Sequence, residues 1–211
     1  MVSFVDFELK HSRGFRLHLG DYQTQRPLLM LTGGNGSGKT SILHAMAGLL
    51  AHRGQVRWHG QPVVAQRRQV GFCLGGLYLP DDWTYADASA FIAFQGRVGA
   101  KPSLLQAAEA AFGLGAFARK PLASLSAGMR QKAKLCLMLA TDPGLLLVDE
   151  PEAHLDEAAT QAWLGLVQAC LQAGKHLVYA THYPRLLTET IPEPVRAHLA
   201  LPHGAAVVEQ A

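Results

Sequence analysis

The sequence predicts an α/β fold with a mostly parallel sheet, an N-terminal antiparallel β subdomain and a helical sub-lobe. Short, wholly apolar runs at residues 28–31 (LLML) and 145–148 (LLLV) are typical of strands buried on both faces. These runs alternate with segments of helical periodicity, a pattern that favours parallel pairing with helices on both faces of the sheet. A glycine-rich turn follows the first run and leads into a helix.

The N-terminal quarter supplies the antiparallel part of this prediction. Apolar and polar residues alternate on either side of residues 11–14 (HSRG), so the first twenty residues predict a β-hairpin with its turn there. After the strand at 28–31 we expect a helix that Gly54 ends. Its apolar face would carry Ile42, Met46, Leu49 and Leu50.

The rest of the chain continues the strand–helix order. Val56 and Trp58 alternate with polar residues in one more strand, and residues 70–74 predict another. The pattern then turns helical over a sub-lobe at about 78–140. Beyond it we expect a strand at 145–148, a helix at about 157–173 and a strand at 176–180. The residues after about Pro184 are too few for an added regulatory domain, so we predict a single domain over 1–211.

Composition narrows the function classes. Hydrophobic residues make up 49% of the 211 positions, which suits a globular core. The formal net charge is only +3, and no basic cluster suggests a nucleic-acid partner. Cys73, Cys136 and Cys170 form no close pair, which favours small buried thiols in a reducing compartment over metal or redox chemistry.

Membrane insertion is also disfavoured. The N-terminus carries charges where a signal peptide has its apolar segment. The most apolar stretch, residues 135–148, is broken by Asp142 and Pro143 and is shorter than the ~20 residues that a spanning helix needs. We expect a cytoplasmic protein that reaches the membrane only through a partner.

The glycine-rich turn reads GGNGSGKT and predicts a nucleotide phosphate site. Glycines let successive N–H groups point at a phosphate, and the helix N-terminus adds positive potential. Lys39 would reach the β- and γ-phosphates of ATP, and the Thr40 hydroxyl would ligate Mg²⁺. The predicted nucleotide-binding residues are Gly33, Gly34, Asn35, Gly36, Ser37, Gly38, Lys39, Thr40 and Ser41.

Two carboxylates follow the strand at 145–148. We expect Asp149 to hold the Mg²⁺ shell and Glu150 to act as general base toward the attacking water. An acidic pair before Pro151 could instead cap a helix. The phosphate loop upstream favours the catalytic interpretation.

The segment LSAGMRQ, residues 125–131, precedes this acidic pair. A serine and a glycine at a helix start can bind a phosphate, although an ordinary serine cap explains the segment in isolation. The order GGNGSGKT, LSAGMRQ, LLLVDEP, AHLD and then His182 after HLVYA covers most of the chain. This order resembles the ATP-binding cassette (ABC) family of P-loop ATPases, whose signature is LSGGQ.

The resemblance implies an assembly that spacing alone does not show. Two cassettes would face each other head to tail, as a homodimer or a heterodimer. ATP would lie between the Lys39 loop of one chain and the Ser126 and Gly128 loop of the other. Asp156 would belong to the loop that couples the two sites, and His182 would contact the γ-phosphate and orient the attacking water. The helical sub-lobe would hold a separate multi-pass transmembrane subunit.

The sequence departs from the family pattern in two places. The family carries a glutamine where this sequence has about Gly75, so we expect slow hydrolysis by the isolated subunit. Family members also stack adenine on an aromatic residue. Phe15 is the candidate, but it shares the face of Leu17 and Leu19, so core packing is an equal alternative.

The function predicted from these motifs is the ATPase subunit of a membrane transporter. The reading LSAGMRQK with LLLVDEP is similar to exporter cassettes. The compact length and the segment GQVRWHGQPV also resemble the haem exporter ATPase of cytochrome c maturation. A soluble ABC assembly factor that moves no substrate is the alternative. A cassette that only binds nucleotide is a third, which the missing glutamine keeps open and Lys39, Glu150 and His182 oppose.

Overall fold

The computed structural model of this chain describes residues 1–10, 15–74, 80–96, 98–201 and 206–208. The predicted turn at 11–14 and Gly75 lie outside the described residues.

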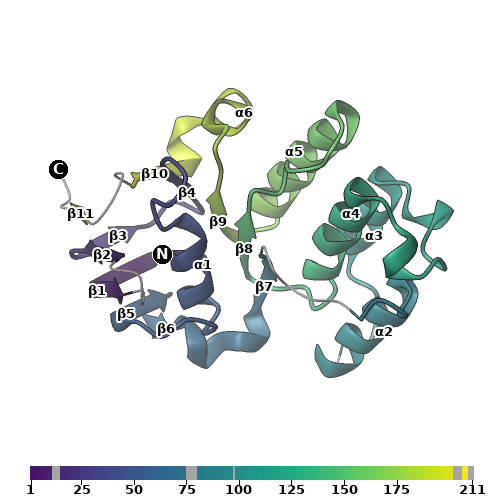
Figure 1. Ribbon diagram of the computed structural model, residues 1–211, viewed down its shortest axis with the longest axis horizontal. Helices are drawn as coiled ribbons and strands as arrows, with labels where there is room; N and C mark the ends of the chain where they lie inside the picture. Colours follow the sequence, from purple (N-terminus) through teal and green to yellow (C-terminus); the bar gives the residue numbers. More distant parts are fainter. Residues whose placement is uncertain (11–14, 75–79, 97, 202–205, 209–211) are drawn as a thin grey trace.

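A five-stranded parallel sheet forms the centre of the molecule (Figure 1). Its order is β10-β4-β9-β8-β7, and each neighbouring pair is parallel. The strands are β4 (Leu28–Thr32), β7 (Val70–Cys73), β8 (Leu145–Asp149), β9 (His176–Ala180) and β10 (Arg196–Ala200). The predicted strands at 28–31, 70–74, 145–148 and 176–180 are therefore confirmed.

A second, largely antiparallel sheet holds the N-terminal hairpin and has the order β11-β2-β1-β5-β6, with β3 paired to β1. The hairpin pairs β1 with β2 and places Phe7 opposite Leu19. The strands are β1 (Val2–Lys10), β2 (Arg16–Leu19), β3 (Tyr22–Thr24), β5 (Arg53–Trp58), β6 (Gln61–Pro62) and β11 (Ala206–Val208). The predicted N-terminal antiparallel subdomain is confirmed.

Six α-helices complete the described fold, three of them in the lobe at the right of Figure 1. Those three are α2 (Tyr85–Gly96), α3 (Ser103–Ala111) and α4 (Ala127–Met138). The others are α1 (Lys39–Met46), α5 (Glu157–Gln172) and α6 (Pro184–Thr190). Short 3₁₀ turns lie at Val63–Gln69, Leu114–Ala116, Leu122–Ser124 and Glu193–Val195.

Alternate residues of the central strands pack into two different cores. Leu28 and Met30 face a cluster that includes residues of α3, α4 and α5. Leu29 and Leu31 face the other cluster, which contains α1 and the inner side of the antiparallel sheet. All four side chains are fully buried, which explains why the strand reads as a solid apolar run.

The helix after the glycine-rich turn ends earlier than predicted. α1 stops at Met46, and Gly48 adopts a left-handed φ of 75°. Leu49 is 58% exposed, and Leu50 packs against the core from beyond the end of the helix. The prediction that both residues continue the buried face of this helix was therefore wrong. The apolar spacing persisted in the sequence after the helix had ended.

Gly54 does not end that helix and instead lies in β5, beside an irregularity in β1 between Val5 and Glu8. Its φ is 75°, and a Cβ atom there would lie 2.1 Å from the carbonyl oxygen of Asp6. Only glycine tolerates both this conformation and this close backbone approach.

The described residues after Pro184 form regular elements. α6 is followed by β10, which pairs with β4 along its whole length, so the tail supplies the edge strand of the central sheet. Its Pro and Gly residues did not predict this strand.

Candidate nucleotide site

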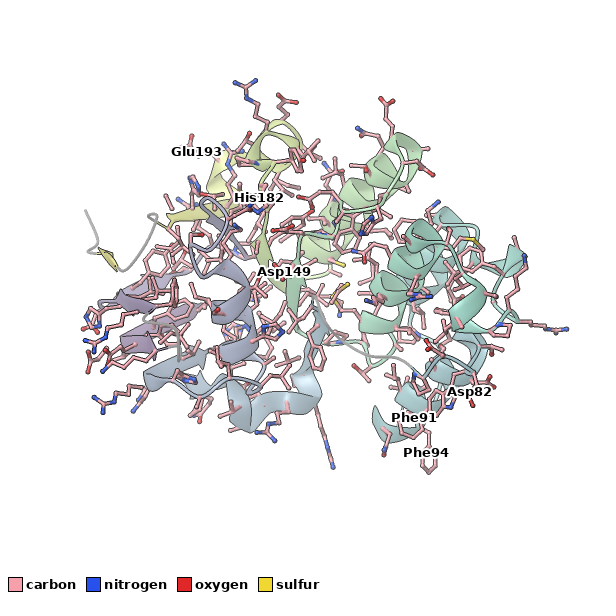
Figure 2. The ribbon with its side chains drawn as sticks, in the orientation of Figure 1. Asp82, Phe91, Phe94, Asp149, His182 and Glu193 are labelled. Atoms are coloured by element: carbon pink, nitrogen blue, oxygen red, sulfur yellow. The ribbon has the colours of Figure 1, made fainter. Side chains whose placement is uncertain are left out.

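A cleft of about 380 Å³ lies where the carboxyl ends of β4, β8 and β9 meet. It is lined by Phe15, residues 35–41, Glu150 and His182, which come from four separate parts of the chain. Figure 2 shows Asp149 and His182 on this side of the central strands, away from Phe91 and Phe94 of the helical lobe. Ligands of open α/β sheets bind at this edge of the strands.

The loop from β4 to α1 curls tightly because of its glycines. Gly38 caps α1 in the left-handed region with φ 99°, and a Cβ there would lie 2.8 Å from the Phe15 ring. Gly36 has φ 77° with open space around it, so the loop presents bare backbone to the cleft. This geometry suits an approaching phosphate.

Lys39 is almost fully buried at the base of this loop, with 4% of its surface exposed. Its Nζ donates to the carbonyl oxygens of Gly33 (2.8 Å) and Gly34 (3.2 Å) and lies 3.3 Å from His182 Nε2. Burial lowers the pKa of the Lys39 ammonium, while Glu150 and Asp149 act to raise it. The Lys39 side chain is thus mostly withdrawn from water, which strengthens the attraction of its ammonium to a phosphate in the cleft.

Glu150 and His182 meet across the cleft, with Glu150 Oε1 2.8 Å from His182 Nε2. Glu150 adopts φ 44°, a left-handed conformation that is uncommon for a residue with a side chain. Its N–H donates to the carbonyl of Ala180 (2.9 Å), which fixes the backbone in that conformation. Such strain is found at functional sites.

The donors near Lys39 fit Mg²⁺ and a nucleotide. Thr40 lines the cleft from the first turn of α1, and Asp149 ends β8 close enough to Lys39 to affect its pKa. Hydroxyl and carboxylate oxygens are the ligands that Mg²⁺ prefers. The cleft volume also lies in the range of ordinary ligand pockets.

Phe15 lies at the rim of the cleft, half-buried against Gly38, whereas Leu17 and Leu19 are fully buried in the core. The sequence left adenine stacking and core packing as alternatives for Phe15. The position of the ring is compatible with both, because it packs on the phosphate loop and also lines the cleft.

Ser126 and Gly128 do not line this cleft; they begin α4 in the helical lobe. The exposed Ser126 caps the helix by accepting from the Met129 N–H (3.2 Å). A Cβ at Gly128 would lie 2.7 Å from the His154 carbonyl oxygen, so the start of α4 packs tightly on the segment after Glu150. Lys132 also pairs with Asp156 at 3.4 Å.

Glu152 and Thr181 were missed by the sequence interpretation. Each lies within two residues of a predicted catalytic residue, and the Thr181 hydroxyl donates to Glu152 Oε1. Their polarity and their positions beside Glu150 and His182 were the available signals. Nothing in the sequence indicated that they meet.

A glycine-rich strand–helix loop around a buried lysine, with a carboxylate pair at the end of another strand of the same sheet, defines a P-loop ATPase. Residues 23–153 match the family model described as ABC transporter. The chain belongs to the ABC transporter family and is an ATP-binding, ATP-hydrolysing subunit of a transporter. Within the described residues no helix is both long and apolar enough to cross a membrane.

Named relatives agree with this assignment. The chain is 36% identical over 163 residues to the cytochrome c biogenesis ATP-binding export protein CcmA of Cupriavidus necator, covering 74% of this chain and 70% of that protein. CcmA of Bordetella bronchiseptica is 37% identical, with 74% and 71% covered. The zinc transport system ATP-binding protein TroB of Treponema pallidum is 30% identical, with 72% and 60% covered.

Solved structures share the fold. An ATP-binding subunit of an ABC transporter superposes with a TM-score of 0.82 at 20% identity, covering 95% of this chain and 85% of the other. The dimeric bacterial ABC transporter cassette MJ0796 gives 0.79 at 19% identity, covering 100% and 97%. The expected cassette fold is confirmed.

Proposed function

We propose that ATP binds in the cleft with its phosphates on residues 33–41 and its adenine against Phe15. The observation that carries this assignment is the meeting of Lys39, Glu150 and His182 in one cleft. Lys39 would bind the β- and γ-phosphates, and Thr40 and Asp149 would hold Mg²⁺, which neutralises phosphate charge when bound.

In the proposed hydrolysis, Glu150 accepts a proton as water attacks the γ-phosphorus, and the bond to the β–γ bridging oxygen breaks. His182 lies within hydrogen-bond distance of Glu150 and Lys39, which supports a role in holding the water and the γ-phosphate. Lys39 offsets the charge that develops on the phosphates.

We further propose that the working site is composite. Ser126 and Gly128 do not line the cleft of their own chain, and their helix start could bind a phosphate held by a second copy. The head-to-tail dimer would close on ATP and reopen after hydrolysis. The contacts of α4 with His154 and Asp156 support communication between the two sites.

A separate transmembrane subunit is the proposed partner of the helical lobe. A cleft of about 290 Å³ separates β7 from α2 and α4 and is lined mainly by apolar residues such as Phe72, Ile92 and Leu137. Phe91 and Phe94 of α2 are 48% and 80% exposed and lie at the outer end of this lobe (Figure 2). A cytoplasmic helix of the membrane subunit would fill the cleft and hold the chain at the inner face of the membrane.

The direction of transport is proposed from the names of the relatives. Several proteins named as ATP-binding export proteins of cytochrome c biogenesis are 33–37% identical over about three quarters of this chain. We infer an export role of that kind, with the membrane subunit selecting the cargo.

Lys39→Ala tests the catalytic assignment. Loss of the buried ammonium should reduce binding of a fluorescent ATP analogue by at least about tenfold, since charged hydrogen bonds are worth ~1.5–3 kcal/mol. Phosphate release should fall to background. Lys10→Ala, which removes an exposed lysine that does not line the cleft, is the control. Unchanged binding by Lys39→Ala would refute the site.

A further inference from the structure

Behind the cleft, a chain of hydrogen bonds connects α5 with the two residues that flank His182. On one side, Trp163 Nε1 donates to the Tyr179 hydroxyl (3.0 Å), which donates to Glu152 Oε2 (3.0 Å). On the other side, the N–H of Tyr183 donates to Thr181 Oγ1 (2.8 Å), and the Thr181 hydroxyl donates to Glu152 Oε1. Both branches end on the same carboxyl group.

The two N–H groups at the ends of this hydrogen-bond network limit how the hydroxyl groups between them can donate. An indole N–H and a backbone N–H can only donate, and each hydroxyl has one proton to give. Each hydroxyl oxygen accepts one of these N–H groups, and the hydroxyls of Tyr179 and Thr181 donate to Glu152. Only the ionised carboxylate accepts freely at both oxygens. Burial raises the pKa of Glu152, and the hydrogen bonds from Thr181 and Tyr179 oppose that rise.

Burial strengthens these hydrogen bonds and restricts their geometry. Trp163, Tyr179 and Thr181 are each only 1% exposed. A hydrogen bond in such a site is not exchanged for one to water, and an acceptor left without its donor is costly. The arrangement therefore holds one geometry.

We propose that Glu152 is a positioning residue that sets His182 against Glu150. Thr181 is held on both sides, since its N–H donates to the Leu31 carbonyl (3.1 Å) and its hydroxyl donates to Glu152. Through the Tyr183 N–H the same hydroxyl also fixes the residue after His182. Glu152 lies on the segment that carries Glu150. Its carboxylate therefore connects the backbone that holds Glu150 with the backbone that holds His182.

This inference rests on the proposed function, in which Glu150 and His182 act together on the γ-phosphate and its attacking water. It predicts a defect in turnover with ATP binding preserved, because Glu152 and Thr181 do not line the nucleotide cleft. A purely structural network would instead lower stability and leave turnover per folded molecule unchanged.

Four variants separate these outcomes. Thr181→Val removes the bridging hydroxyl at nearly constant volume, and Glu152→Ala removes the shared acceptor. Thr181→Ser restores the hydroxyl and is the conservative rescue. Trp163→Phe is the matched control, because it breaks a bond of the same network at the end remote from His182.

The experiment measures steady-state phosphate release against ATP concentration, together with binding of a fluorescent ATP analogue and the melting temperature. For Thr181→Val and Glu152→Ala we expect kcat to fall about tenfold or more, as for loss of a buried hydrogen bond. Nucleotide affinity should stay within about twofold. Thr181→Ser should keep wild-type kcat, and Trp163→Phe should lower the melting temperature and keep kcat. If Thr181→Val does not fold, Thr181→Ala replaces it.

The inference is overturned if Thr181→Val keeps the kcat of Trp163→Phe, or if Thr181→Ser loses as much as Thr181→Val. Failure of the underlying function looks different. In that case Lys39→Ala would bind and hydrolyse ATP like the wild type. A chain that needs Lys39 but tolerates loss of the Thr181 hydroxyl would leave the site intact and reject only the positioning role.

Discussion

At the residue scale, Lys39, Glu150 and His182 show how motif residues become a site. Each follows a strand of the central sheet, and parallel strands bring their carboxyl ends to one edge. Their meeting could be predicted from the sequence because the glycine-rich loop and the acidic pair follow wholly apolar strands. Glu152 and Thr181 could not, since their contact depends on a side chain turning inward between β8 and α5.

Phe15 provides a test of nucleotide recognition at this scale. Phe15→Ala should weaken binding of a fluorescent ATP analogue by about two- to tenfold, because aromatic stacking is worth ~0.5–1.5 kcal/mol. Phe15→Tyr keeps the ring and should bind as the wild type. If Phe15→Ala lowers only the melting temperature, the ring serves core packing and not the adenine.

At the scale of elements, the strands that the sequence predicts are those long enough to show an apolar run or a clear alternation of apolar and polar residues. β4 and β8 read as solid apolar runs because both of their faces are covered. β3 and β6 have three and two residues, which is too short for a period to appear. β10 was missed because Arg196 and His198 interrupt its apolar residues, as an edge strand with one neighbour allows.

The start of β9 makes the fold sensitive to acid. The His176 ring packs edge-on against His59, with ring centroids 4.7 Å apart, and lies close to Trp58. Burial lowers the pKa of His176 to about 4, with smaller contributions from the Met1 amine and His59. Protonation therefore favours the unfolded chain, in which the pKa returns to about 6.5.

Stability from this site should be complete above pH 6.5 and should be lost progressively as the pH falls toward 4. His176→Phe keeps a ring that packs on Trp58 and cannot titrate. Urea unfolding at a series of pH values should show a shallower loss of stability over this range for the variant. Parallel curves for the two proteins would contradict the assignment to His176.

At the scale of the whole molecule, the nucleotide cleft lies at the carboxyl ends of β4, β8 and β9, whereas the apolar cleft runs along the edge strand β7. β8 pairs with both β7 and β9, so the strand that carries Asp149 also borders the strand that lines the apolar cleft. We propose that this shared strand connects the ATP site with the docking site proposed for the membrane subunit. The motifs predicted the family, whereas the position of the apolar cleft required the packing of α2 and α4.

The proposed docking face can be tested by cell fractionation. Phe94→Asp changes a side chain that is 80% exposed, so the fold and basal ATP hydrolysis should be preserved. The charged residue should oppose docking, and the chain should move from the membrane fraction to the supernatant. Val5→Asp, at an exposed apolar position of β1, is the control and should stay with the membrane. Membrane recovery of Phe94→Asp at the wild-type level would exclude the exposed side of α2 around Phe94 from the docking contact.

The most direct test of the account is ATP-dependent dimerisation of Glu150→Gln, measured by size-exclusion chromatography with light scattering. Because the variant retains Lys39 and lacks the general base, we predict a dimer of the chain in ATP and a monomer without nucleotide. Adding Ser126→Arg should restore the monomer while the ATP analogue still binds at the Lys39 loop. A Glu150→Gln chain that binds ATP and stays monomeric would contradict the composite site, as would a dimer that survives Ser126→Arg.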